Sequence, residues 1–143
     1  MKHTHTSVRV HCIFSTKERY RLIPPEVQPR LWSYMGGIAR NLEVKAFAIG
    51  GMEDHVHLLF ALPPVLTLAK VVQTLKANSS RWMNVEIRRG FAWQEGYAAF
   101  SVSISHMDAT IAYIRNQPQH HRKRTFDQEM ETVLAKHGMT KVE

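Results

Sequence analysis

The sequence predicts an α+β fold built on a four-stranded antiparallel sheet. Three observations support this: the order of strand-like and helix-like segments, a length of 143 residues, and a composition that is 44% apolar and 22% charged. This length and composition are typical of one globular domain, so we expect a single domain over residues 1–143. The segments follow the order strand, helix, strand, strand, helix, strand, and two more helices. The first six match the split β-α-β pattern, which is the ferredoxin-like arrangement.

The strands are predicted from the alternation of apolar and polar residues. They cover residues 7–15, 43–52, 54–62 and 98–105. The second strand ends in Gly50-Gly51, and we expect this pair to form the hairpin turn into the third strand.

The helices are predicted from apolar residues at helical spacing, and they cover residues 24–42, 67–87, 105–117 and 125–138. Thr67 is a suitable cap for the second helix. Ser105 with Asp108, and Thr125 with Gln128, resemble capping boxes. The first two helices should cover one face of the sheet. The other face is left to the terminal helices, to a partner or to solvent.

The charge and composition narrow the class of protein. The net charge is +7 and the pI is about 9.9, which favours a polyanionic partner such as nucleic acid. The lone Cys12 excludes an internal disulfide, and no apolar run approaches the ~20 residues of a membrane span. The first residues contain no apolar signal-peptide core, so we expect a cytoplasmic protein without a membrane partner.

The segment "GMEDHVHLLFAL", residues 51–62, places two histidines in an otherwise apolar strand. Successive strand side chains alternate between faces, so His55 and His57 share a face. Two imidazoles side by side form half of a metal site. The alternative is a half-buried pair with ordinary hydrogen-bond partners. A third ligand would come from Glu53, Asp54 or the last helices.

The third predicted helix contains Tyr113 and Gln117, which are four residues apart and therefore on one helical face. Taken alone, such a pair is usually a core aromatic residue and a solvated helix end. Its importance depends on whether it belongs with the histidine pair.

The combination resembles a known family, the single-tyrosine HUH transposases, which include small insertion-sequence transposases and REP-associated tyrosine transposases. "EDHVHLLF" resembles the family's histidine strand, and "YIRNQPQHHRKRTF" its catalytic helix and following loop. "IFSTKERYRLI" resembles the family's first strand and following loop, "LKANSSRW" a basic helix and "WQEGYAAFSVS" the fourth strand, so the resemblance extends from about residue 8 to 126. Glu53 is a departure, because proline is frequent at that position in the family.

The resemblance implies a DNA transposase that cleaves and rejoins single-stranded DNA through a covalent 5′-phosphotyrosine intermediate and recognises hairpin-bearing DNA ends. Tyr113 would be the nucleophile. His55, His57 and Gln117 would bind one divalent metal, Mg²⁺ or Mn²⁺, and imidazole ligands favour Mn²⁺. The resemblance also implies a homodimer that acts at the prokaryotic nucleoid.

Cationic side chains are the expected contacts to DNA phosphates. The candidates are Lys17, Arg19, Arg21, Lys76, Arg81, His121, Arg122 and Arg124. The alternative for each is a solvated surface charge. Two other functions stay open: a non-catalytic module that binds hairpin DNA or RNA, and a metal-dependent phosphoesterase that uses an activated water.

Overall fold

The computed structural model describes residues 3–139, and the predicted domain limits at residues 1 and 143 lie outside them. Its strands are β1 (Arg9–Ser15), β2 (Lys45–Met52), β3 (His55–Ala61) and β4 (Ala98–Ser101). They form one sheet in the order β2-β3-β1-β4, and every neighbouring pair is antiparallel. The predicted four-stranded antiparallel α+β fold is therefore confirmed.

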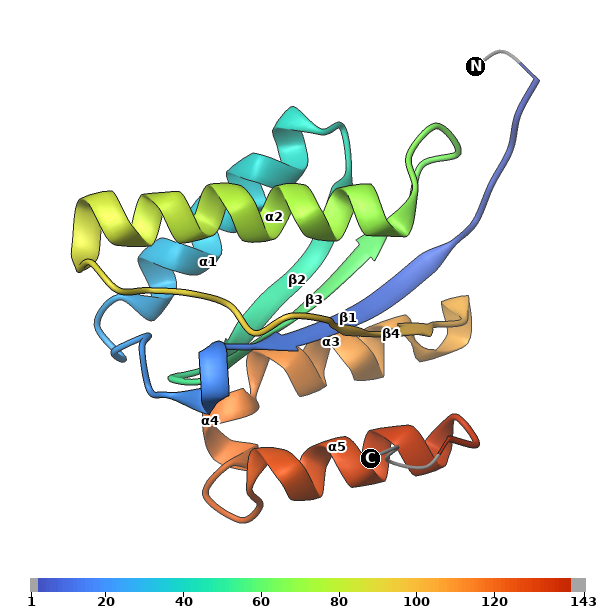
Figure 1. Cartoon of the computed structure of the whole chain (residues 1–143). Helices are drawn as coiled ribbons and strands as arrows, with labels where there is room; N and C mark the ends of the chain where they lie inside the picture. Colours follow the sequence, from blue (N-terminus) through green and yellow to red (C-terminus); the bar gives the residue numbers. More distant parts are fainter. Residues whose placement is uncertain (1–2, 140–143) are drawn as a thin grey trace.

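The helices form two layers, one on each face of the sheet (Figure 1). Helices α1 (Gln28–Asn41) and α2 (Leu68–Trp82) cover one face. Helices α3 (Met107–Arg115), α4 (Gln117–His120) and α5 (Phe126–Lys136) lie on the other. Three short helical turns complete the described elements: η1 (Lys17–Arg19), η2 (Met83–Ile87) and η3 (Ile104–His106). Within residues 3–139, no helix combines the length and apolar character needed to cross a bilayer.

The alternation along β3 divides its side chains between the two layers, as predicted. Val56, Leu58 and Phe60 are fully buried in the main core with α1 and α2. Each such side chain contributes on the order of 1.5–3 kcal/mol by leaving water. His55, His57 and Leu59 therefore face the layer formed by α3, α4 and α5.

The predicted Gly-Gly hairpin turn is wrong. Gly50 and Gly51 are paired strand residues opposite His57 and Val56, and the turn is formed by Glu53 and Asp54. At Gly50 the packing leaves no room for a side chain. A Cβ on Gly50 would lie 2.5 Å from the Ile114 carbonyl oxygen, so glycine allows α3 to approach β2 closely.

The predicted helix over residues 105–117 is interrupted. Asn116 leaves the helical conformation (φ −100°, ψ 22°), and Pro118 lies in the first turn of α4 instead of ending α3. The Ser105–Asp108 capping pair is also wrong, because α3 is preceded by η3 and has no side-chain cap. The caps at Thr67 and at Thr125 with Gln128 are both confirmed.

The remaining elements are shorter than predicted. The first helix starts at Gln28 rather than residue 24, α2 passes into a π-helical turn after Trp82, and β4 ends at Ser101. These differences are confined to element ends, where the periodic pattern is weakest.

Gly50→Ala should destabilise the protein, whereas Gly36→Ala should not. The new methyl on Gly50 would force α3 away from β2, at a cost of about 1–3 kcal/mol. At Gly36, inside α1, the nearest side-chain atom is 3.8 Å from the added Cβ, so alanine should stabilise the helix by about 0.5–1 kcal/mol. Urea unfolding followed by circular dichroism measures both. Equal stability of the two variants would contradict this packing interpretation.

Candidate metal and nucleophile site

The two predicted histidines lie at the start of β3, on the face covered by α3, α4 and α5. His55 and His57 are both 0% exposed, and so is Gln117 at the start of α4. His55 Nε2 lies 2.9 Å from Gln117 Oε1, and its Nδ1 lies 2.7 Å from an Asp54 carboxylate oxygen. The structure therefore brings together the histidine pair and the glutamine that the sequence suggested.

A carboxylate from α5, Glu129, occupies the centre of this group. Its Oε1 lies 3.2 Å from Nε2 of His57, 3.2 Å from Nε2 of His121 and 3.4 Å from Nε2 of His55. Its Oε2 accepts hydrogen bonds from Gln117 Nε2, at 2.9 Å, and from the Tyr113 hydroxyl. The nucleophile candidate and the metal-ligand candidates thus meet at one side chain.

Sequence reasoning missed Glu129, although it named the last helices as a source of a third ligand. Glu129 is only 2% exposed, whereas Glu131 on the same helix is exposed. Three acidic residues at alternate positions, Asp127, Glu129 and Glu131, are typical of a solvated helix start, so nothing local distinguished the middle one.

A third strand residue, His11 on β1, was also missed. Its Nε2 lies 2.8 Å from His57 Nδ1, and the two rings stack with centroids 5.1 Å apart. With a neutral His57 ring, His11 donates to Nδ1 and His57 Nε2–H donates to Glu129. His11 therefore fixes the orientation of the His57 ring. Metal binding through His57 Nε2 would require the other tautomer, in which Nδ1–H donates to His11 Nε2.

Burial and the central carboxylate move the pKa values of the site in opposite directions. Burial lowers the pKa of His57 to about 4 and, with help from His57, that of His11 to about 3. Burial also opposes a charge on His55, but hydrogen bonds to Asp54, Glu129 and Gln117 outweigh it and raise the His55 pKa to about 9. His55 is thus the cationic member of the group.

The acidic groups follow the same logic. Burial alone would raise the pKa of Glu129, but hydrogen bonds from His121, His55 and His57 hold it far below its usual range. Burial, and then the bond to Glu129, raise the pKa of the Tyr113 hydroxyl. In this arrangement the tyrosine is a protonated donor and Glu129 an ionised acceptor.

The donor set fits a divalent metal. Imidazole nitrogens, an amide oxygen and a carboxylate oxygen are ligands used by Mn²⁺ and Mg²⁺ sites, with nitrogen favouring Mn²⁺. One ligand atom from each of His55, His121 and Glu129 lies within 4.8 Å of the others. Glu53 takes no part in this group, since its nearest side-chain partner is Gln28 Nε2, at 3.5 Å.

Some of the predicted DNA contacts gather beside this site. Arg21, His121, Arg122 and Arg124 line a cleft of about 500 Å³, together with Asp54 and Phe126. Arg19 lies two residues before Arg21 in the sequence, and its guanidinium forms an ion pair with Asp127 at 2.7 Å. Lys17 lies in the same short turn, η1.

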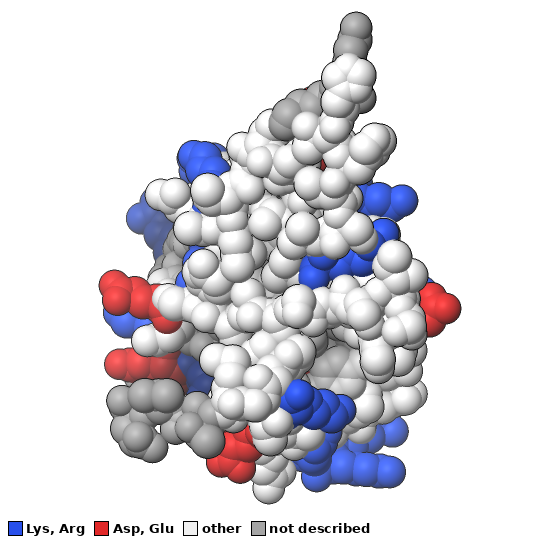
Figure 2. Space-filling model, turned by 90° about the vertical axis from the view of Figure 1, so that its right-hand side faces the viewer, with Lys and Arg blue, Asp and Glu red and all other residues white. Residues whose placement is uncertain are grey.

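Two other predicted DNA contacts lie elsewhere. Lys76 and Arg81 belong to α2, in the layer on the opposite face of the sheet, where Lys76 Nζ donates to the carbonyl oxygens of Gln94 and Gly96. On the face that Figure 2 presents, lysine and arginine side chains form several separate groups rather than one continuous patch. Net charge by itself therefore does not outline a DNA path.

The family model described as "Transposase IS200 like" matches residues 4–117. The chain belongs to the IS200-like transposase family. This match includes the histidine strand, Tyr113 and Gln117, and it ends before Glu129. No curated protein matches the chain.

Two solved structures resemble this transposase. One is a protein from Deinococcus radiodurans R1 provisionally assigned as a transposase, with 29% identity and a TM-score of 0.66 over 80% of this chain and 94% of that one. The other is a REP-associated tyrosine transposase solved with a REP hairpin, with 13% identity and a TM-score of 0.61 over 85% and 74% of the two chains. The second likeness shows the shared fold.

The pKa shifts predict a stability maximum near pH 6.5 in metal-free buffer. The raised pKa of His55 adds stability that is complete below pH 6.5 and is lost as the pH rises through about 9. The lowered pKa values of His57 and His11 add stability that is present above pH 6.5 and is lost as the pH falls towards 4 and 3. Urea unfolding midpoints measured across this pH range in EDTA test both the loss of stability at alkaline pH (the alkaline limb) and the loss at acid pH (the acid limb).

Asp54→Asn is the matched test of the alkaline limb. Asparagine removes the ionised acceptor of His55 Nδ1, so the His55 pKa should fall and the stability lost above pH 6.5 should shrink. The acid limb should remain. An unchanged alkaline limb in this variant would rule out His55 as its source.

Proposed function

We propose that this transposase cleaves and rejoins single-stranded DNA, with Tyr113 as the nucleophile. One observation carries the proposal: the Tyr113 hydroxyl and the metal-ligand candidates His55, His57 and Gln117 share the carboxylate of Glu129. A water-using phosphoesterase has no need of a tyrosine at that point. A pure binding module has no need of the buried histidine pair.

We assign the metal ligands to His55, His57 and Gln117, joined by Glu129. A divalent metal at this position would polarise the scissile phosphate, neutralise charge on its oxygens and favour the ionised tyrosine. Asp54 holds the far nitrogen of His55, and His11 holds that of His57, so both rings are oriented from behind. His121 lies close enough to serve as a further ligand or as a donor to the phosphate.

In the proposed reaction the Tyr113 oxygen attacks the phosphorus, and the bond from phosphorus to the 3′-oxygen breaks. The tyrosine proton leaves, the 3′-oxygen takes up a proton, and a 5′-phosphotyrosine link remains. Since the link conserves the phosphodiester energy, a 3′-hydroxyl can reverse the step without ATP. Tyr113 must first release its hydrogen bond to Glu129, which keeps it protonated in the described arrangement.

The cleft that contains Arg21, Arg122 and Arg124 is the proposed entry of the DNA strand. It adjoins Asp54 and His121, so phosphates bound there would lead directly to the histidine pair. The solved relative bound to a REP hairpin supports hairpin-bearing ends as the substrate. A homodimer acting at the nucleoid is the assembly we propose from the family resemblance.

Tyr113→Phe should abolish covalent attachment to DNA. Wild-type protein incubated with Mn²⁺ and labelled single-stranded DNA from the flanks of its gene should yield an adduct that resists SDS and disappears with protease. Tyr97→Phe, a change at an exposed tyrosine, should retain the adduct. Free cleavage that survives Tyr113→Phe would favour the phosphoesterase. DNA binding without cleavage in any divalent metal would favour the binding module.

Glu129→Gln should weaken metal binding by at least about 10-fold, because changes in the residues behind the ligands alone cost about 10–100-fold. The change keeps the side-chain size but removes the charge that faces three imidazoles. The concentration of Mn²⁺ needed to raise the thermal unfolding midpoint measures this without any DNA. Glu131→Gln, on the exposed side of α5, is the matched control. Identical Mn²⁺ dependence in the two variants would exclude Glu129 as a ligand.

A further inference from the structure

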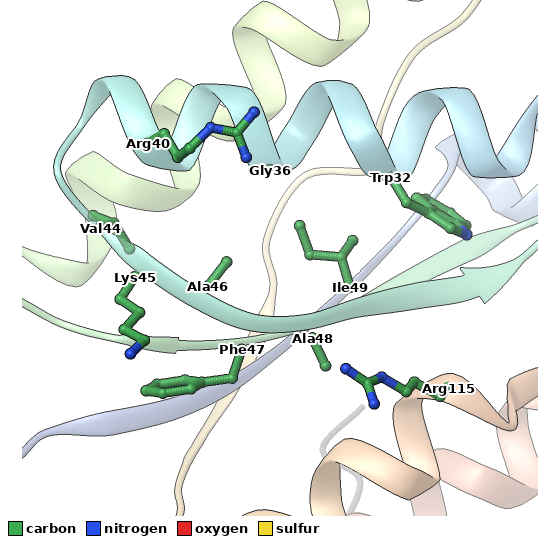
Figure 3. A pocket seen from close by; sticks show the side chains of 10 residues that line it. All are labelled: Trp32, Gly36, Arg40, Val44, Lys45, Ala46, Phe47, Ala48, Ile49 and Arg115. Carbon is green, nitrogen blue, oxygen red and sulfur yellow. The ribbon is translucent and has the colours of Figure 1, made fainter.

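A second candidate binding site lies along the free edge of β2, apart from the histidine group. It is a groove of about 470 Å³ between α1, β2 and α3 (Figure 3). None of its lining residues belongs to the metal and nucleophile site. Its connection to that site is α3, which carries Arg115 at the groove and Tyr113 at Glu129.

The groove is cationic. Arg40 comes from α1, Lys45 from β2 and Arg115 from α3, and all three are exposed. No acidic residue lines the groove, and none of the three forms an ion pair within residues 3–139. Such a set of cations without carboxylates is suited to phosphate groups.

The groove also contains aromatic surface. The ring of Phe47, half-buried in β2, has Lys45 Nζ 5.4 Å and Arg9 Cζ 5.8 Å from its centroid. Trp32 contributes a second half-buried ring from α1. Aromatic rings beside lysine and arginine are the usual platform for an unpaired base and its phosphates.

Strand pairing with a second copy is the main competing use of a free sheet edge, and the residues oppose it. Lys45 places a charge on the edge, and the β2–β3 register shifts between Ala46 and Ala48, which bulges the strand at Phe47. In a symmetric dimer the cations of both copies would also face one another. A polyanion removes that repulsion.

We propose that this groove binds an unpaired nucleotide of single-stranded DNA, with phosphates on Arg40, Lys45 and Arg115 and the base against Phe47. A volume of about 470 Å³ suits one nucleotide rather than a duplex. The choice of DNA over RNA rests on the proposed function. The groove would hold the strand at a point away from the cut, so it is a positioning site and not a catalytic one.

The first test is DNA binding in EDTA, where the metal-dependent reaction is absent. Fluorescence anisotropy with a labelled oligothymidine of about 15 nucleotides compares two double variants of equal charge. Lys45→Gln/Arg115→Gln should weaken binding about 10-fold and lower the salt slope by about 1.4, because each lost contact removes about 0.7. Arg88→Gln/Arg89→Gln, at exposed positions outside the groove, should bind like the wild type. Equal losses in both would overturn the proposal in favour of net charge.

The second test locates the base. An oligonucleotide with one 5-iododeoxyuridine, irradiated with the full-length protein, should crosslink to the peptide that contains Phe47. Phe47→Leu should remove that crosslink while circular dichroism remains unchanged. Crosslinks that map only to other peptides would overturn the proposal. So would a dimer that dissociates in Lys45→Gln/Arg115→Gln, since it would assign the edge to a second copy.

The two proposals can fail separately. Loss of the Tyr113 adduct with the Phe47 crosslink retained would reject the proposed chemistry and keep the groove. An adduct formed without the crosslink would reject the groove and keep the chemistry.

Discussion

The arrangement of the C-terminal layer depends on one buried carboxylate. Glu129 is the only buried residue of α5, so this helix is held over the sheet largely by polar contacts and two ring stacks rather than by an apolar stripe. An ionised carboxylate in such a place would be costly without compensation. Here the compensation comes from three histidines, a glutamine and a tyrosine, which are the residues that chemistry at this site requires. The same contacts of Glu129 therefore hold α5 over the sheet and compensate the buried charge of the site.

The sheet can hold this buried polar group because its two faces differ in character. One face packs apolar side chains against α1 and α2 and forms the larger of the two apolar clusters. The opposite face carries His11, His55 and His57, fully or nearly fully buried, yet no buried polar side-chain atom in the described part of the chain lacks a partner. Strand alternation places His55 and His57 on one face and Val56, Leu58 and Phe60 on the other within the seven residues of β3, and His11 joins the histidines from β1. Rigid neighbours on the apolar face hold the imidazoles still, which a metal site needs.

The parts of this site that follow from local periodicity could be predicted, and the parts set by distant contacts could not. His55 and His57 share a face because any strand would place them so, and Tyr113 and Gln117 remained close even though the helix breaks at Asn116. Glu129 lies 72 residues from His57, and only the path of the chain after His120 selects it over Asp127 and Glu131. The wrong prediction of a hairpin turn at Gly50-Gly51 also arose from a contact between residues that are distant in sequence. Gly50 resembles a turn residue locally, but the carbonyl of Ile114 explains it.

The closed site also constrains how a DNA strand can reach it. His55, His57 and Gln117 have no exposed surface with α5 in place, so a scissile phosphate cannot touch them in this arrangement. On the proposed function, α5 must shift before cleavage. Moving α5 would expose little apolar surface, because the helix buries no apolar residue fully. The main free-energy cost of the shift is the loss of the hydrogen bonds that Glu129 makes. On the proposed function, the phosphate would meet the divalent metal held by His55, His57, Gln117 and Glu129, and the metal would balance the negative charge that the phosphate brings. The carboxylate that closes the site in this arrangement is thus the same side chain that would join the metal ligands on the proposed function.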